Sequence, residues 1–412
     1  MKATAIIGAN FGDEGKGLMT DYFAAQGDSV VVRFNGGAQA GHTVTLREPS
    51  HGNVFHHFGS GTLAGSPTYL SKYFILNPML FRREYEDLKK KGITPEVYID
   101  SECLVTTPFD MMLNQIIEVV RGDNRHGSCG IGINETIVRH KKIPIYLTDY
   151  SDCLPDKFKR ILDYIESRLT EFGISEIPGR FRHIFENCEA VIEKFLDDVE
   201  FVKNISGGYF FKALKKNIIF EGAQGLLLDE DSRFFPYVTH SKTGLCNVIK
   251  LIKDWELDID FLKVVYVTRC YTTRHGVGPL PFEVKKEILP FFIRDTTNIN
   301  NEFQGDLRFG YLSLDYLSKT INTDLAENAK LPLEANLAIT CLDQIPGNAT
   351  FEKDGILYYS SIDSFISLAL KSIHTNFGYI SWGPCRDDVM NYRVTNSDSL
   401  LKGVLNGQVA TS

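Results

Sequence analysis

Five short apolar runs are spaced along the chain, and each is followed within a few residues by glycine, aspartate, threonine or arginine. The runs are Thr4–Ile7, Val30–Phe34, Ile218–Phe220, Val264–Val267 and Leu337–Thr340. A run that is apolar at nearly every position predicts a strand covered on both faces, as in a mostly parallel sheet. Ligands bind such sheets at the carboxyl ends of the strands. The polar segments that follow these runs are therefore the candidates for function.

Two further segments keep the apolar spacing of amphipathic helices. Their apolar positions are Phe158, Ile161, Leu162, Ile165 and Leu169 in the first, and Val191, Ile192, Phe195, Leu196 and Val199 in the second. Core packing explains both stripes. No linker, low-complexity stretch or repeat divides the chain. We expect one α/β domain over residues 1–412, with a large mostly parallel central sheet, flanking helices and a helical insertion around residues 100–210.

Composition narrows the function classes. The formal net charge of the 412 residues is −8, and no basic tail is present, which disfavours nucleic acid as a partner. No stretch of about 18 apolar residues predicts a membrane helix, and the N-terminal residues show no signal-peptide pattern. The eight cysteines are scattered without a CxxC pair, which disfavours a disulfide framework or a zinc site. We expect a cytoplasmic protein.

The segment GANFGDEGKG at residues 8–17 directly follows the first apolar run. Its glycines let backbone N–H groups approach phosphate oxygens, and Lys16 adds a positive charge. Two carboxylates, Asp13 and Glu14, would repel a phosphate unless one binds Mg²⁺ or accepts a proton. The segment departs from the P-loop pattern, because Asn10 replaces its first glycine and Gly17 replaces its Ser or Thr. It is a candidate catalytic loop.

Other polar segments follow the remaining runs. GGAQAGHT at 36–43 places His42 among glycines, which favours a proton donor or charge stabiliser over a structural histidine. GSCGIG at 127–132 has the composition of an anion-binding nest, or of an ordinary loop. The Gln224 amide suits a base edge, and the Thr239 hydroxyl suits a phosphate. Asp343 ends the last run, where its two oxygens suit a guanine edge or a helix cap.

Taken in order, these segments resemble the adenylosuccinate synthetase family. The matching segments are GDEGKG at 12–17, GGAQAGHT at 36–43, FEGAQG at 220–225, PYVT at 236–239, TTRHGVGP at 272–279, TCLD at 340–343 and SWGP at 381–384. The resemblance spans nearly the whole chain, and the ordered set is far more specific than any one motif. It implies a P-loop-NTPase-like fold. It also implies a ligase that joins L-aspartate to the 6-position of IMP through a 6-phosphoryl intermediate, with GTP as phosphoryl donor.

The resemblance also implies roles for residues. Asp13 would be the general base and a Mg²⁺ ligand, with the Gly41 carbonyl as a second ligand. Lys16 and His42 would stabilise the transferred phosphoryl group, and Gln224 would orient the purine. Nucleotide phosphates would contact Gly12, Glu14, Gly15, Gly17, Gly41 and Thr43. The monophosphate would contact Gln39, Ser128, Cys129 and Thr239, and the GTP base would contact Cys341, Asp343, Ser381 and Gly383. Members are homodimers, and Arg139 is the candidate arginine that reaches the neighbouring subunit's IMP.

Several positions depart from the family pattern. The arginine-rich aspartate loop is replaced by Phe303–Leu312, in which Gly305 and Arg308 remain as candidates for binding aspartate and Asp306 adds an unfavourable charge. TCLD lacks the family's lysine, which leaves the donor open between GTP and ATP. Cys129 replaces a threonine, and Gln39 replaces an asparagine. The amino-acid and monophosphate sites are thus the altered ones.

These departures keep two other functions open. A phage branch of the family joins aspartate to dGMP, and in part of that branch the loop aspartate is replaced. Asp13 is retained here, which favours IMP, although differences of about 1–3 kcal/mol would switch the preference. The other alternative is a nucleotide-binding protein without ligase activity. The joint presence of Asp13, Lys16, His42 and Gln224 argues against it, because a binding protein needs neither a base nor an acid.

Overall fold

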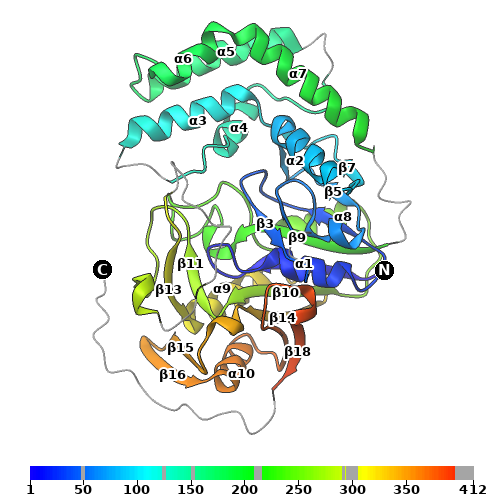
Figure 1. The fold of residues 1–412 in the computed structure, drawn as a ribbon, viewed down its shortest axis with the longest axis vertical. Helices are drawn as coiled ribbons and strands as arrows, with labels where there is room; N and C mark the ends of the chain where they lie inside the picture. The colour runs from blue at the N-terminus through cyan, green and yellow to red at the C-terminus, as the bar shows by residue number, and fades with distance from the viewer. Residues whose placement is uncertain are drawn as a thin grey trace.

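The structure is a computed structural model, and it describes residues 1–47, 52–122, 127–149, 154–207, 216–289, 293 and 305–394. Figure 1 shows three parts along its longest axis. A large sheet with α1 and α8 lies in the middle, a layer of helices α3 to α7 lies at one end, and β15, β16 and α10 lie at the other. Among the described residues, none of the helices combines the length and the apolar character needed to cross a bilayer.

The large sheet has nine strands and is parallel except at one edge, where β18 runs antiparallel to β17. In spatial order the strands are β18 (Val389–Arg393), β17 (Phe377–Ser381), β14 (Leu333–Thr340), β10 (Leu262–Arg269), β1 (Ala3–Gly8), β9 (Asn217–Gly225), β2 (Ser29–Arg33), β5 (Thr68–Leu70) and β7 (Val97–Ile99). The five apolar runs correspond to β1, β2, β9, β10 and β14, so the predicted sheet is confirmed. Their side chains are almost fully buried, as expected for strands covered on both faces.

The register of these strands places their carboxyl ends together. Gly8 pairs with Gly225 of β9 and with Val267 of β10, and Arg269 pairs with Thr340 of β14. Because neighbouring parallel strands end at the same edge of a sheet, the segments after β1, β9, β10 and β14 must meet there. β2 lies beside β9 and adds the segment that contains His42.

The smaller sheet carries the segments after β10. Its strands in order are β11 (Tyr271–Arg274), β13 (Arg308–Ser313), β15 (Asn348–Lys353) and β16 (Ile356–Ser361), and β12 (Glu283–Val284) also pairs with β13. Arg274 and Arg308 are cross-strand partners. Two short ribbons complete the strands: β3 (His42–Val44) with β4 (Asn53–Phe55), and β6 (Ile75–Leu76) with β8 (Leu104–Val105).

The α-helices are α1 (Lys16–Ala24), α2 (Pro78–Lys90), α3 (Pro108–Arg121), α4 (Ile133–His140), α5 (Leu154–Glu171), α6 (Gly179–Glu186), α7 (Cys188–Ile205), α8 (Cys246–Asp254), α9 (Leu314–Glu327) and α10 (Ile362–Ser372). Short 3₁₀ helices are η2 (Ser60–Ala64), η5 (Leu226–Leu228), η6 (Lys286–Ile288), η7 (Leu342–Gln344) and η8 (Arg386–Asp388). The two predicted helical stripes lie on α5 and α7, where Phe158, Ile161 and Phe195 join one buried cluster. The helices between residues 108 and 205 fall where the insertion is predicted, and the division into domains stays a prediction.

Candidate active site

The loop between β1 and α1 is held in shape by its own glutamate. Glu14 Oε1 accepts hydrogen bonds from the backbone N–H groups of Asn10 (3.0 Å) and Gly12 (2.8 Å). Its other oxygen pairs with Lys16 Nζ at 2.6 Å, and both side chains are buried. The two neighbouring carboxylates therefore have different functions. The Glu14 carboxylate is engaged inside the loop, so a contact of Glu14 with a nucleotide phosphate stays a prediction for its backbone N–H alone.

Asp13 is the carboxylate that faces outward. Its side chain is 24% exposed, and its backbone is left-handed with φ of 60°. A non-glycine residue in this region is strained unless its surroundings fix it. Arg269 Nε donates to the Asp13 carbonyl, and His275 Nε2 lies 3.5 Å from Asp13 Oδ2. The first contact comes from the carboxyl end of β10, and the second comes from the turn after β11.

Gly17 explains one departure from the P-loop pattern. A Cβ at this position would lie 2.8 Å from the Thr43 carbonyl oxygen and 3.2 Å from His42 Cβ. Only glycine allows the two loops to approach this closely. The start of α1 and the GGAQAGHT segment thus pack directly against each other, which brings Lys16 and His42 into one site.

His42 is held by a buried carboxylate. Its Nδ1 lies 2.7 Å from Glu221 Oε1, and the same carboxylate accepts hydrogen bonds from the Ser60 N–H (3.0 Å) and hydroxyl. Burial lowers the pKa of His42 to about 4. Burial alone would raise the pKa of Glu221, but His42, Arg33 and Ser60 together lower it. The imidazole is therefore neutral near pH 7 and donates Nδ1–H to Glu221, which leaves Nε2 as an acceptor.

Two amides and a second glycine join the β2 and β9 segments. Gln39 Nε2 lies 3.5 Å from Gln224 Oε1, and Gln224 has a left-handed backbone with φ of 56°. Behind them, the Asn35 side chain bonds both the N–H (2.7 Å) and the carbonyl (3.1 Å) of Ala223. A Cβ at Gly12 would lie 3.9 Å from Gln224 Cα. The structure thus places the loops that carry Asp13, His42 and Gln224 against one another, as the sequence predicts.

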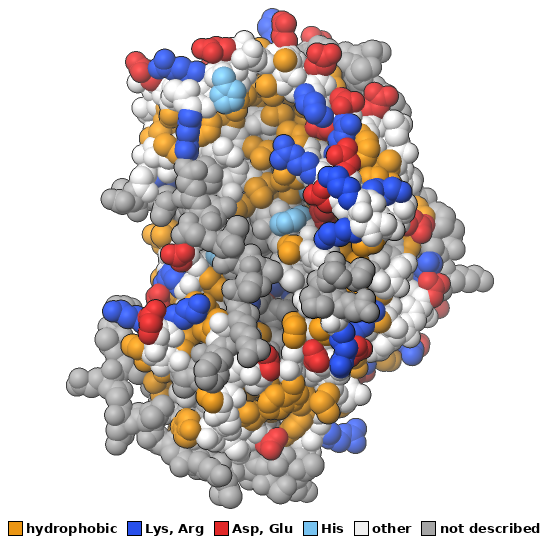
Figure 2. Space-filling view, viewed as in Figure 1, with side chains coloured by type: hydrophobic (Ala, Val, Ile, Leu, Met, Phe, Trp, Pro, Cys, Tyr) orange, Lys and Arg blue, Asp and Glu red, His pale blue; other side chains and the backbone are white. Residues whose placement is uncertain are grey.

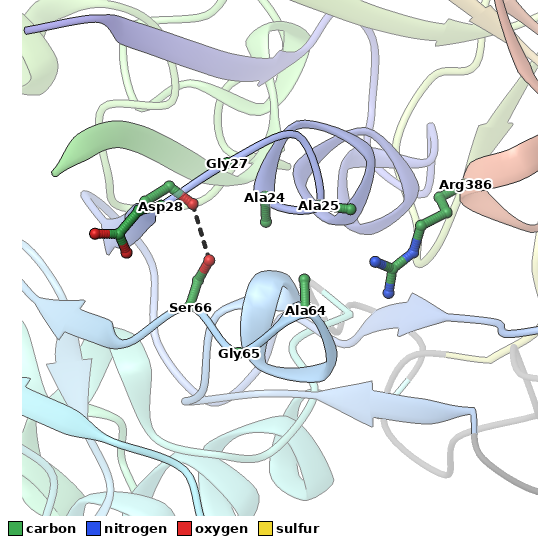
Figure 3. Close-up of a pocket in the computed structure, with 9 residues that line it drawn as sticks. Ala24, Ala25, Gly27, Asp28, Ala64, Gly65, Ser66 and Arg386 are labelled. Atoms are coloured by element: carbon green, nitrogen blue, oxygen red, sulfur yellow. Dashed lines mark hydrogen bonds between the residues drawn. The ribbon is translucent and has the colours of Figure 1, made fainter.

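The predicted base-reading segments end β14 and β17. Thr340 Oγ1 donates to the Glu14 carbonyl at 2.7 Å, which ties Cys341 and the exposed Asp343 to the catalytic loop. The Ser381 hydroxyl donates to the Gly383 carbonyl at 2.5 Å. The turn after it is tied to α1 by Arg386 Nε, which lies 2.7 Å from the buried Asp21 carboxylate. Figure 3 shows Arg386 reaching toward α1 at one end of a cavity of about 320 Å³.

The glycine-rich turn at 127–132 does not present a vacant anion nest. Glu118, which is buried on α3, accepts hydrogen bonds from the N–H groups of Gly127 (3.0 Å) and Ser128 (3.3 Å). The Ser128 hydroxyl pairs with Asn114, and burial raises the pKa of the Cys129 thiol to about 11. Two of the N–H groups that a backbone phosphate nest would use are therefore already bonded to Glu118, and the rest of that interpretation stays a prediction. The Ser128 N–H is thus already bonded, and its hydroxyl is the group that Ser128 would offer to a nucleotide.

Arg139 does not reach outward. It is fully buried, and its guanidinium bonds the Asp110 carboxylate and the carbonyls of Val105 and Ile143. These bonds join α3, α4 and β8, because a buried guanidinium needs all its donors satisfied. The expectation that Arg139 contacts a neighbouring subunit's nucleotide is corrected to a structural role.

The described part of the altered aspartate loop begins at Gly305, which has φ of 78°; Phe303 and Gln304 lie outside the described residues. Arg308 forms a two-pronged pair with Glu283, in which Nε lies 2.8 Å from Oε1. Its Nη1 donates to the carbonyls of Gly276 (3.0 Å) and Gly278 (2.7 Å). A guanidinium that binds one carboxylate in this way has the geometry to bind another.

Thr239 ends the PYVT segment, which contacts Arg274 at the end of β11. Its backbone N–H donates to the Leu228 carbonyl at 2.8 Å, and its side chain is half-buried. The neighbouring Tyr237 carbonyl accepts from Arg274 Nη2 at 2.6 Å. PYVT therefore packs on the turn after β11.

Sequence reasoning assigned no role to three residues that the structure places in the site: Glu221, Arg269 and His275. Glu221 lies within β9 beside β1, Arg269 ends β10, and His275 begins the turn after β11. These positions were the available signal. Their partners, His42 and Asp13, are far away in sequence, so no local motif reveals the pairing.

A second cavity, of about 410 Å³, adjoins the site. It is lined by residues of the GGAQAGHT segment, β4, α2 and the glycine-rich turn, among them Ala38, Val54, His56, Arg83 and Ile131. Figure 2 shows hydrophobic side chains gathered in the hollow between the helical layer and the large sheet, with basic side chains beside them. Gln39 and Ser128, which the sequence predicts to bind the monophosphate, are close in sequence to the lining residues Ala38 and Ile131.

Comparison with known proteins decides the family. The adenylosuccinate synthetase family model matches residues 5–354. The chain belongs to the adenylosuccinate synthetase family. Members of this family are C–N ligases. The adenylosuccinate synthetase of Clostridium perfringens is 32% identical over 365 residues, which are 86% of this chain and 82% of the relative. That of Xylella fastidiosa strain 9a5c is 32% identical over 296 residues, or 70% of this chain and 66% of the relative.

Solved adenylosuccinate synthetases share the fold. The fully ligated enzyme of Plasmodium falciparum superposes with a TM-score of 0.74 at 19% identity, covering 94% of this chain and 99% of the other. The cyanophage S-2L succinoaminodeoxyadenylate synthetase, bound to dGMP and dATP, superposes with a TM-score of 0.60 at 16% identity, covering 96% and 97%. At such identities the likeness establishes the α/β fold with its large mostly parallel sheet.

Proposed function

We propose that this chain joins L-aspartate to the 6-position of IMP with hydrolysis of GTP, giving adenylosuccinate. The observation that carries the proposal is that the loop bearing the outward-facing Asp13 carboxylate packs, through Gly17, against the segment bearing the His42–Glu221 pair. The family is established, whereas the substrates and the residue roles are proposed.

In the first step, the Asp13 carboxylate accepts the N1 proton of IMP. The electrons of the N1–H bond move into the ring, O6 becomes nucleophilic, and a bond forms between O6 and the γ-phosphorus of GTP. The bond between the γ-phosphorus and the β–γ bridging oxygen breaks, and GDP leaves. The product is 6-phosphoryl-IMP.

In the second step, the α-amine of aspartate attacks C6. The bond between C6 and O6 breaks, inorganic phosphate leaves with O6, and the amine loses a proton to solvent. Arg308 binds the Glu283 carboxylate in two-pronged geometry, and it is our candidate for binding a carboxylate of the substrate aspartate. The Gly305 backbone is our second candidate for contacting aspartate.

His42 stabilises charge during the transfer. In the ligand-free protein it is neutral, because burial holds its pKa near 4. Bound phosphates add negative charge next to Nε2, and nearby opposite charge favours the imidazolium. Glu221 then stabilises the Nδ1–H side, while Nε2–H donates to the phosphoryl oxygens. Lys16, whose charge acts on His42, adds a second positive charge.

The other candidates divide between two nucleotides. We assign the triphosphate to the backbone of Gly12, Gly15, Gly17, Gly41 and Thr43, with Cys341, Asp343, Ser381 and Gly383 at its base. We assign the purine monophosphate to Gln39, Gln224, Thr239 and the side chains of Ser128 and Cys129. We also propose a cytoplasmic homodimer, and analytical ultracentrifugation measures its stoichiometry.

The residues present fit a Mg²⁺ ion. Among the described residues, the Asp13 carboxylate has one polar contact, with His275 Nε2 at 3.5 Å from Oδ2, so its oxygens keep lone pairs. The exposed Gly41 offers a carbonyl. Mg²⁺ binds one or two protein oxygens and takes the rest of its ligands from phosphates and water. When bound, it would neutralise charge on the triphosphate.

The second candidate substrate is dGMP, with ATP as a further candidate donor. The cyanophage enzyme that shares this fold is described as bound to dGMP and dATP. In this chain Cys341 replaces the lysine next to the base-reading aspartate, which leaves the donor base less specified. The retained Asp13 favours IMP.

A coupled assay tests the proposal. Purified protein is incubated with IMP or dGMP, L-aspartate, Mg²⁺ and GTP or ATP, and the diphosphate and the succinylated product are quantified. We expect the highest kcat/KM with IMP and GTP. A higher value with dGMP would establish the phage-type reaction. Nucleotide binding without turnover in every combination would identify a binding protein and reject the ligase.

A further inference from the structure

Residues 269–275 contact the candidate catalytic loop, at Gly12 and Asp13, through three side chains. Arg269 Nε donates to the Asp13 carbonyl, and Thr273 Oγ1 donates to the Gly12 carbonyl at 3.3 Å. His275 Nε2 lies 3.5 Å from Asp13 Oδ2. The first two contacts fix the backbone of Gly12 and Asp13. The third is the contact that the described residues make with the Asp13 carboxylate itself.

A fixed backbone does not fix the carboxylate. Asp13 has a left-handed φ of 60°, and its side chain is 24% exposed. The terminal torsion of an aspartate is broad, so the two oxygens can rotate unless a side chain holds one of them. A base must present one oxygen within hydrogen-bond reach of the proton it accepts.

The turn that carries His275 is itself held on both sides. Arg308 Nη1 donates to the carbonyls of Gly276 and Gly278. On the other side, Gly127 packs so closely that a Cβ there would lie 3.1 Å from Gly276 Cα. The turn that carries the His275 imidazole therefore contacts both Arg308 of the altered aspartate loop and Gly127 of the glycine-rich turn.

We propose that His275 is the positioning residue for Asp13. With its proton on Nε2, the imidazole donates to Oδ2 and directs Oδ1 toward the purine ring proton. Each carboxylate oxygen has two lone pairs, so Oδ2 can accept this bond and still bind a cation. The inference rests on the proposed function, because Asp13 must be the base for its orientation to affect turnover.

Two substitutions at this position separate positioning from folding. His275→Val removes the donor, and His275→Gln keeps an N–H donor on a flexible side chain. We expect His275→Val to lower kcat about 10- to 100-fold, with the KM of the monophosphate changed less than threefold, because misplacement of a reacting group costs rate rather than affinity. His275→Gln should recover at least a third of the lost activity on a logarithmic scale. His183→Val, on the exposed face of α6, is the matched control and should retain full activity.

The first step can be measured alone. Without aspartate, exchange of ¹⁸O between the bridging and non-bridging positions of the β-phosphate of GTP reports transfer of the γ-phosphoryl group and its return. His275→Val should slow this exchange by the same factor as kcat. An exchange rate and kcat within twofold of the unmodified protein would overturn the proposal.

Crystal structures make the inference testable apart from the ligase. In the unmodified protein we expect Asp13 Oδ2 directed at His275 Nε2, and in His275→Val a rotated or doubly placed Asp13 carboxylate. An unchanged Asp13 side chain in His275→Val would refute its positioning, whatever the activity. Absence of turnover in the unmodified protein with every substrate pair would instead refute the proposed function.

Discussion

The two ends of the candidate site are built differently. At the nucleotide end, the charged groups are buried in pairs, Lys16 with Glu14 and Arg33 with Glu221, and the neutral His42 also bonds Glu221. At the amino-acid end, Arg308 and Glu283 form a pair whose side chains are 28% and 43% exposed. Removing one partner of a buried ion pair strongly lowers the free energy of unfolding, whereas exposed pairs contribute little to stability. The nucleotide end is therefore preorganised, and the amino-acid end can exchange one carboxylate for another.

Asp13→Asn should break the nucleotide end most severely. The amide cannot accept the purine proton, so we expect kcat to fall at least about 10³-fold. The outward-facing side chain makes no buried pair, so the free energy of unfolding should change by less than about 1 kcal/mol. Steady-state kinetics and denaturant unfolding measure the two quantities.

The exposed Asp258→Asn is the control for Asp13→Asn and should change neither. Retained turnover in Asp13→Asn would remove Asp13 as the base. A large loss of stability would show that the loop, rather than the chemistry, had been disrupted.

Glu221→Gln should affect activity and stability together. The amide keeps hydrogen bonds to Ser60 but leaves Arg33 buried without a negative charge and His42 without a stabilised Nδ1–H. We expect kcat to fall about 10²-fold and the free energy of unfolding to fall by about 3 kcal/mol, the scale of a broken buried pair. Glu352→Gln is the matched control, since that buried carboxyl bonds Ser313 and Gly355. A Glu221→Gln variant as stable as the Glu352→Gln variant would show that the charge on Glu221 is dispensable.

Arg308→Ala tests whether the amino-acid end exchanges carboxylates. We expect the KM of aspartate to rise about tenfold or more, with the KM of the monophosphate unchanged. Glu283→Gln removes the internal competitor but leaves Arg308 in place, so it should lower the KM of aspartate about two- to fivefold. If both variants leave the KM of aspartate unchanged, Arg308 does not bind the substrate.

The sequence predicted five strands of the large sheet, but it did not predict which side chains pair at the site. The apolar runs predicted β1, β2, β9, β10 and β14, because burial on both faces is recorded in consecutive residues. The parallel arrangement then brought the glycine-rich loops to one edge. What could not be read was which side chain pairs with which across that edge.

Glu14 and Asp13 illustrate this limit, because adjacent carboxylates took opposite directions. Arg139 illustrates it too, since an arginine near the end of a helix looks exposed until Asp110 is placed beside it. Glu118 filled a turn whose sequence resembles a vacant nest. Each outcome depends on a partner supplied by tertiary packing, and such partners leave no local pattern.

The last expected effect is on stability alone and concerns Asp21, which extends the buried end of the site from α1 to the turn after β17. Burial raises the pKa of Asp21 to about 6, although Arg386 opposes the shift. Its ordinary value is 3.8, so the folded protein holds this proton more tightly than the unfolded chain. The stability that Asp21 contributes is therefore full below pH 3.8 and is lost as the pH rises through 6.

Asp21→Asn is neutral at every pH and lacks this loss. The free energy of unfolding of Asp21→Asn, relative to the unmodified protein, should thus rise by about 2 kcal/mol between pH 4 and pH 7 and stay constant above. Asp28→Asn, which lines the cavity that Arg386 also lines and is 74% exposed, is the control and should show no such rise. Parallel curves for Asp21→Asn and the unmodified protein would mean that Arg386 fully compensates the burial of this carboxylate. The turn after β17 would then be held to α1 by an ordinary ion pair, and the two ends of the site would differ less than their exposures indicate.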